Sequence, residues 1–184
     1  MYTEPLQFKS DNFKDNRGEF APFEITKEFK DFKLLQVNTV VNYSPFTFRG
    51  LHWQEPPYDQ TKIIRCISGK IVDFVIDIRV GSPNYGQFYG FPLYEPNTWV
   101  YVPRGFAHGY VTLPSDKDIP NIVEYLVDNE YNKESERGLD FASRLNSLLK
   151  EEVPYDFELI VNDRDLHWPV LEEIDTKFRY DSNE

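Results

Sequence analysis

The chain has 184 residues, with 20 Lys and Arg against 31 Asp and Glu, and its formal net charge is −11. The length is typical of one domain, and 40% hydrophobic with 16% aromatic residues exclude a disordered chain. The acidity argues against a general binder of nucleic acid or anionic membranes, and the single cysteine, Cys66, excludes an intramolecular disulfide framework. Without a signal-peptide pattern or a run approaching the roughly 20 apolar residues of a membrane span, a cytoplasmic protein is expected.

The charge is unevenly distributed along the chain. Residues 1–114 contain 12 basic and 12 acidic residues, whereas residues 115–184 contain 8 basic and 19 acidic residues. The whole acidic excess therefore belongs to the last third, where a solvated rim is expected. The electroneutral first part can still hold a small anion.

Most of the sequence predicts short strands separated by turns. Ser68-Gly69, between two of these strands, is typical of a hairpin, and residues 81–86 form a turn cluster. Many strands with Gly and Pro turns predict a sandwich or barrel rather than βαβ units. The runs that predict strands are 34–41, 62–67, 70–79, 99–103, 109–113 and 121–127.

Only two segments predict helices. Residues 26–32 are short and charged. Residues 140–152 place Phe141, Leu145 and Leu149 on one face, with Asp140 as the expected N-cap. The polar tail after Phe178 is expected to fray.

The strand at 70–79 carries two acidic residues on one face. Asp73 and Asp77 alternate with apolar residues there, and they could partner Lys62 and Arg65 of the preceding strand. Two interpretations are open for this face, a solvated sheet surface or a polar barrel interior.

A strand-like segment contains the first histidine. Alternation predicts Arg49, Leu51 and Trp53 on one face of this strand, and His52 with Gln54 on the other. Taken alone, a histidine in such a strand is more often structural than catalytic.

The other histidines give no metal signature. His108 follows a Gly- and Pro-rich loop, His167 lies in a separate segment, and the sequence has no His-x-His pair. A metal site is therefore not expected, and Cys66 is expected to be a small buried residue.

Five motifs stand in one order along the chain. They are Arg-Gly-Leu-His-Trp-Gln at 49–54, Lys-Ile-Ile-Arg-Cys at 62–66, the strand at 69–79, the turn at 81–86, and Val-Pro-Arg-Gly-Phe-Ala-His-Gly at 102–109. This series resembles the dTDP-4-dehydrorhamnose 3,5-epimerase family. The likeness begins at 16–18, runs through 136–138, and resumes at 162–163 and 168–169.

The resemblance implies both a fold and an activity. The implied fold is mainly β, a cupin (jelly-roll) barrel with short peripheral helices, as one domain over residues 1–184. The implied enzyme is a homodimer without metal or cofactor that inverts C3 and/or C5 of a dTDP-linked 4-keto-6-deoxyhexose. Other readings are a mono-epimerase or keto-isomerase of another nucleotide sugar, a catalytically silent sugar-nucleotide-binding cupin and, less strongly, a metal-dependent cupin oxygenase.

The resemblance also implies roles for individual residues. His52 matches the general base, Lys62 the lysine that stabilises the enolate oxygen, and Tyr125 the tyrosine that returns a proton from the opposite face. The family's acidic partner of the base lies in a Leu-Ser-x-Lys-Asp segment after Trp-Pro, and residues 171–175 make Asp175 the best match. The positions that match substrate contacts are Arg49, His108 and Tyr131, with Gln36 and Asn38 less securely, and Arg17 matches an arginine donated across the dimer.

These residue types suit the chemistry. Removing a weakly acidic proton next to a ketone needs a base poised near neutral pH, as histidine is. Negative charge then develops on the carbonyl oxygen, which a fixed cation stabilises. Inversion needs a second acid on the other face.

The sequence departs from the family pattern in three places. The lead to Asp175 is short, so Asp163 or Asp181 could take its part. Residues 139–158 are interpreted as a helical insertion. Pro22 stands where the family has a glutamate.

Overall fold

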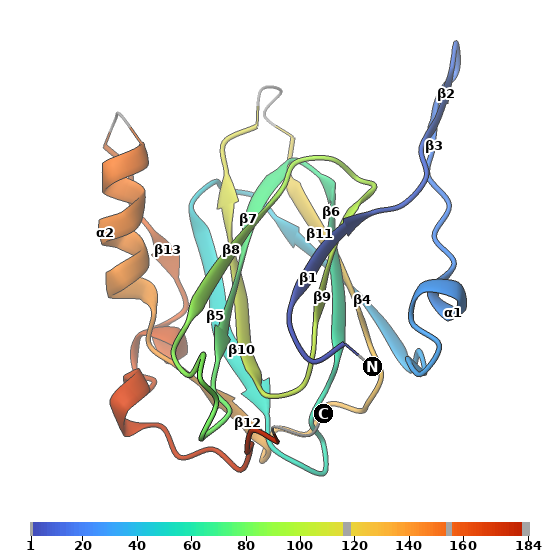
Figure 1. The fold of residues 1–184 in the computed structure, drawn as a ribbon. Coiled ribbons are helices and arrows are strands. Elements are labelled where there is room, and N and C mark those ends of the chain that lie inside the picture. The colour runs from blue at the N-terminus through green and yellow to red at the C-terminus, as the bar shows by residue number, and fades with distance from the viewer. Residues whose placement is uncertain (1, 116–118, 154–155, 182–184) are drawn as a thin grey trace.

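The computed structural model describes residues 2–115, 119–153 and 156–181. Within these residues, two sheets pack face to face (Figure 1). The first sheet is antiparallel, in the order β1 (Leu6–Lys9), β9 (Thr98–Val102), β6 (Lys62–Ser68), β11 (Asn121–Val127) and β4 (Gln36–Asn42).

The second sheet carries the remaining long strands. Its order is β12 (Glu136–Gly138), β5 (Thr47–Gln54), β10 (Phe106–Leu113), β7 (Lys70–Asp77) and β8 (Phe88–Leu93). The short strand β13 (Ile160–Val161) adds to β5 in parallel. The predicted mainly-β, cupin-like jelly roll is confirmed.

A hairpin arm projects from the sandwich (Figure 1). It consists of β2 (Phe13–Asp15) and β3 (Gly18–Phe20), which pair only with each other. Phe13 and Phe20 stack across the hairpin, and both are more than half exposed.

The apolar residues form three clusters that account for the layers. One fills the space between the sheets and includes Ile64, Val75 and Val100. A second covers the outer face of the second sheet, where helix α2 (Ala142–Glu152) packs. A third covers the outer face of the first sheet beside the short helix α1 (Ile25–Glu28). Strand β7 is thus buried on both faces.

The two predicted helices are both found, with different bounds. The first ends at Glu28, because Phe29 and Phe32 turn inward onto the aromatic cluster over the first sheet. The second begins at Ala142 rather than directly after Asp140, yet Asp140 Oδ1 accepts a hydrogen bond from the Ala142 N–H at 3.1 Å. Asp140 therefore still satisfies one free N–H at the start of the helix.

The predicted hairpin at Ser68-Gly69 is wrong. Strand β6 pairs with β9 and β11, whereas β7 pairs with β8 and β10 in the other sheet. Gly69, at φ +85°, forms a corner at which the chain crosses between sheets. Both strands are rich in apolar residues because each contributes to the interior, and a local pattern cannot separate this arrangement from a hairpin.

Backbone hydrogen bonds hold the chain beyond Phe178. The Tyr180 N–H donates to Val80 O at 3.0 Å, and the Val80 N–H donates to Phe178 O at 3.1 Å. The prediction of fraying directly after Phe178 is therefore wrong, and residues 182–184 lie outside the described residues. No helix of the described part of the chain is long and apolar enough to cross a membrane.

Candidate active site

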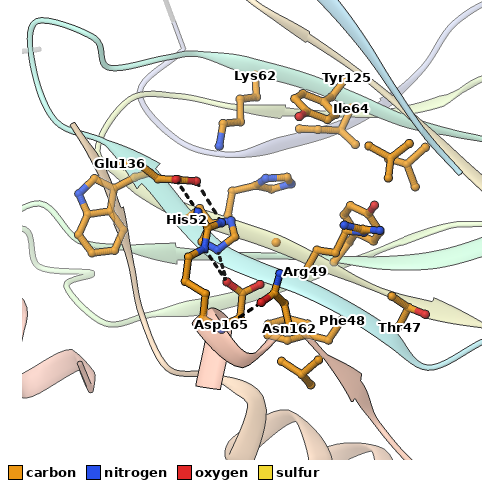
Figure 2. Close-up of a pocket in the computed structure, with 18 of the residues that line it drawn as sticks. Thr47, Phe48, Arg49, His52, Lys62, Ile64, Tyr125, Glu136, Asn162 and Asp165 are labelled. Carbon is orange, nitrogen blue, oxygen red and sulfur yellow. Dashed lines mark hydrogen bonds and ion pairs between the residues drawn. The ribbon is translucent and has the colours of Figure 1, made fainter. Parts of the chain in front are cut away.

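A cavity of about 540 Å³ lies between the two sheets (Figure 2). Strands β5 and β10 form one wall, β6 and β11 form the opposite wall, and the segment from β13 to the 3₁₀ helix η1 (Asp163–Leu166) closes a side. The predicted site residues that line it are Arg49, His52, Lys62, His108, Tyr125 and Tyr131.

A bulge in β5 brings two of these side chains to one face. Between the pairs His108–His52 and Tyr110–Arg49, β10 advances two residues while β5 advances three. The predicted separation of Arg49 and His52 onto opposite faces is therefore wrong, because one extra residue reverses the alternation. Gly50 allows the bulge, since a Cβ there would lie 2.7 Å from Gly109 Cα.

His52 is held by a buried carboxylate. Its Nε2 lies 2.7 Å from Asp165 Oδ1. Asp165 is 3% exposed and also accepts from the Gly50 N–H and from Trp168 Nε1, each at 3.3 Å. Burial by itself raises the pKa of Asp165, but its hydrogen bond with His52 and the other donors hold that pKa below the usual value. An ionised carboxylate only accepts, so Nε2 carries the hydrogen and Nδ1 remains to take a proton.

The expected pairing of His52 with Asp175 is therefore wrong. Asp175 is exposed and does not line the cavity, and the alternatives Asp163 and Asp181 are not the partner either. The missed signal lies before Trp168-Pro169 rather than after it. Residues 161–165 read Val-Asn-Asp-Arg-Asp, which keeps the spacing of Leu-Ser-x-Lys-Asp with similar residue types. Asn replaces Ser as a cap: its side chain accepts from the Arg164 N–H at 3.0 Å.

Lys62 lies half-buried between the sheets and lines the cavity. Burial lowers the pKa of Lys62 to about 8, against the opposing effect of the carboxylates Asp73 and Glu136. Asp73 is completely buried, and its Oδ2 lies 2.7 Å from His108 Nε2. Burial raises the pKa of Asp73, while His108 and Lys62 lower it. The interpretation of a polar barrel interior is confirmed for Lys62 and Asp73.

Arg65 and Asp77, the other two charged residues of these strands, do not line the cavity. Arg65 pairs with Glu124 at 2.7 Å and stacks on Trp99 on the outer face of the first sheet. Asp77 pairs with Arg79 at 2.6 Å.

Tyr125 faces His52 from the opposite sheet. It comes from β11, and Figure 2 shows Tyr125 and Lys62 across the cavity from His52 and Asp165. Burial raises the pKa of Tyr125, and Arg49 opposes this. Its phenol is therefore neutral at physiological pH and carries a proton to donate.

Three polar side chains that line the cavity are joined by hydrogen bonds. Tyr131 donates to Glu136 Oε2 at 2.9 Å, and Arg164 Nη1 donates to the same oxygen at 2.7 Å. Glu136 and Arg164 also line the cavity, and they did not emerge from the sequence.

The remaining predicted contacts do not line the cavity. Gln36 and Asn38 hydrogen-bond each other on β4, and Asn38 lies opposite Tyr125 on the same sheet face. Arg17 sits on the arm, where its side chain is 86% exposed and pairs with Asp15.

Two smaller predictions concern metal and thiol chemistry. No group of three or more His, Cys, Asp or Glu side chains that could hold a metal ion occurs among the described residues. Cys66 is buried as expected, and burial raises its pKa to about 11.

Comparison with known proteins shows a family match over most of the chain. Residues 3–173 match the model of the dTDP-4-dehydrorhamnose 3,5-epimerase family. The chain belongs to this family. A dTDP-4-dehydrorhamnose 3,5-epimerase from Sinorhizobium fredii is 35% identical over 176 residues, covering 91% of this chain and 85% of that protein.

Two further relatives show the range of the family. A dTDP-4-dehydro-6-deoxyglucose 3-epimerase from a Streptomyces species is 32% identical, covering 85% of this chain and 79% of that protein. The crystal structure of an epimerase from Legionella pneumophila, in complex with dTDP-4-keto-L-rhamnose, superposes with a TM-score of 0.82 at 26% identity. It covers 97% of this chain and 94% of the other.

Proposed function

We propose that this protein is an epimerase that inverts C3 and C5 of a dTDP-4-keto-6-deoxyhexose. One observation carries the proposal: the His52–Asp165 pair lies on one wall of the cavity and the neutral phenol of Tyr125 on the other. Inversion at carbon needs a base and an acid on opposite faces of the substrate, and this arrangement supplies both.

The reaction follows from the side chains. His52 Nδ1 takes the proton from the carbon next to the ketone, and the C–H electron pair moves to form the C=C bond as the carbonyl becomes an enolate. Asp165 stabilises the imidazolium formed. The Lys62 ammonium stabilises the enolate oxygen. Tyr125 then gives its proton to the same carbon from the other side, and the enolate collapses back to the ketone.

The cations around the cavity support an anionic substrate. Arg49 and Lys62 line it and belong to the electroneutral part of the chain, and Arg164 adds a third cation from the acidic part. The Legionella relative was crystallised with a dTDP-linked keto sugar, which supports the same nucleotide here.

A homodimer is the second part of the proposal. The exposed Arg17 on the projecting arm lies outside the cavity of its own chain, which suits a contact donated to a second copy. We also propose that residues 1–184 act as one domain in the cytoplasm, with 139–158 as an insertion that carries α2.

Nucleotide choice and product distinguish the proposal from its alternatives. Melting shifts should be larger with dTDP than with GDP or UDP, because a ligand of the folded state raises its stability. NMR of the product should show inversion at both carbons. Inversion at C3 alone would make the protein a mono-epimerase, and binding without turnover would make it a silent sugar-nucleotide binder. A monomeric mass by light scattering would contradict the dimer.

A further inference from the structure

Arg49 enters the cavity from β5 and is anchored through one nitrogen. Its Nε donates to Asn42 Oδ1 at 2.9 Å. No carboxylate of the described residues forms an ion pair with its guanidinium. The two Nη groups are therefore left for a ligand in the cavity that Arg49 lines.

The anchor, Asn42, is a buried amide that the mechanism above does not use. It is the last residue of β4 and is 2% exposed. Its Nδ2 donates to Asn121 O at 3.1 Å and lies 3.3 Å from Tyr110 Oη. Asn42 thus ties the guanidinium to the backbone of the opposite sheet.

The partners of Asn42 fix which way its amide points. Asn121 O only accepts, so Nδ2 must face it, and Arg49 Nε only donates, so Oδ1 must face Arg49. A flipped amide would oppose two donors on one side and two acceptors on the other. Tyr110 Oη is a looser neighbour, at 3.3 Å from Nδ2 and 3.5 Å from Oδ1.

We propose that Asn42 is a positioning residue that fixes the plane of the Arg49 guanidinium and directs its two Nη groups at the substrate. The inference rests on the proposed function, in which Arg49 contacts the nucleotide sugar. A free arginine side chain is flexible and loses this freedom on binding, whereas a held one is already oriented. Two adjacent Nη groups match a pair of oxygens, such as those of a diphosphate.

Two substitutions of Asn42 separate positioning from a merely structural role. Asn42→Leu removes the acceptor for Nε. Asn42→Asp keeps that acceptor but sets an oxygen against Asn121 O, so it should lower the melting temperature more than it alters binding. Tyr110→Phe is the matched control, because it removes a neighbouring hydroxyl and leaves the Arg49 bond intact.

The test is steady-state kinetics with the dTDP-4-keto-6-deoxy sugar, with melting temperatures recorded beside it. We expect Asn42→Leu to raise KM about tenfold with kcat changed less than about twofold, the effect of losing one hydrogen bond to a charged group from uniform binding. KM for Asn42→Asp and Tyr110→Phe should stay within about twofold of the unsubstituted enzyme. In an Arg49→Ala background, Asn42→Leu should add nothing.

Three results would overturn the inference. One is an equal rise in KM from Asn42→Leu with and without Arg49, and another is a KM that follows melting temperature across the variants. The third is an unchanged KM for Arg49→Ala, in which case turnover of the keto sugar would still support the proposed function. If Asn42→Leu does not fold, Asn42→Ala takes its place with the same expectations.

Discussion

Two histidine–carboxylate pairs, each with its histidine lining the cavity, have the same N···O distance but differ in exposure and in hydrogen-bond partners. His52–Asp165 and His108–Asp73 both measure 2.7 Å. The His52 side chain is 21% exposed and that of His108 is 9% exposed. Asp165 accepts two further N–H bonds and its pKa is lowered, whereas Asp73 Oδ1 has no hydrogen-bond partner in the described residues and its pKa is raised.

Burial raises the pKa of both carboxylates; at Asp165 the hydrogen bond with His52 and the two further N–H donors outweigh it, whereas at Asp73 His108 and Lys62 do not. Asp165 is stabilised as an anion, which suits a group that must support an imidazolium at His52. Asp73 is less well solvated, and its charge raises the pKa of Lys62. In the proposed mechanism, one pair orients the base, and the other raises the pKa of the lysine that stabilises the enolate.

Removing the base should have the largest effect. His52→Asn should lower kcat by about a thousandfold, within the range of a general base. His108→Asn should cost clearly less, because His108 is a contact in this account. His167→Asn, which alters an exposed histidine outside the cavity, is the matched control in the same kinetic assay. A larger loss from His108→Asn would reverse the assignment of the two pairs.

Removing the carboxylate partner of the base should have the next largest effect. Asp165→Asn should lower kcat by about a hundredfold, because the amide neither fixes the tautomer of His52 nor stabilises its charged form. Asp175→Asn should leave kcat unchanged. Equal losses from both, or a loss from Asp175→Asn alone, would restore the partner expected from sequence.

The pH dependence of kcat should show the effect of Asp73, from the His108–Asp73 pair, on Lys62. Lys62 must be protonated to stabilise the enolate, so kcat should fall as pH rises through about 8. Asp73 raises the pKa of Lys62, so Asp73→Asn should move this alkaline limb to lower pH and lower kcat severalfold at pH 8. A pH–rate profile measures both. An unmoved limb in Asp73→Asn would show that Asp73 does not act on Lys62.

Much of the fold could be predicted from sequence because β-branched runs and turn residues mark strands locally. Strands β7 and β11 lie within predicted runs, whereas β6 and β10 each extend beyond the runs predicted for them. Strands β12 and β13 did not emerge, because strands of two or three residues are too short to show alternation. The pairing of β6 was mispredicted because only long-range packing decides which sheet a buried strand joins.

In the site too, some features could be predicted from local sequence and others could not. His52, Lys62 and Tyr125 were expected in the site from the family resemblance, and all three line the cavity. Asp165 could not be recognised because Asn and Arg replace Ser and Lys in its segment, and because that segment lies before Trp168-Pro169 rather than after it. The bulge at Gly50 could not be read from alternation, since one extra residue reverses the faces without changing the residue types.

Exchange in D2O tests the central claim most directly. The purified protein, incubated with its keto sugar in D2O, should place deuterium at C3 and C5 with inverted configuration. Tyr125→Phe should still exchange the proton that His52 removes but should lose inversion. No exchange with authentic substrate, or full inversion by Tyr125→Phe, would contradict a base and an acid acting from opposite walls of the cavity.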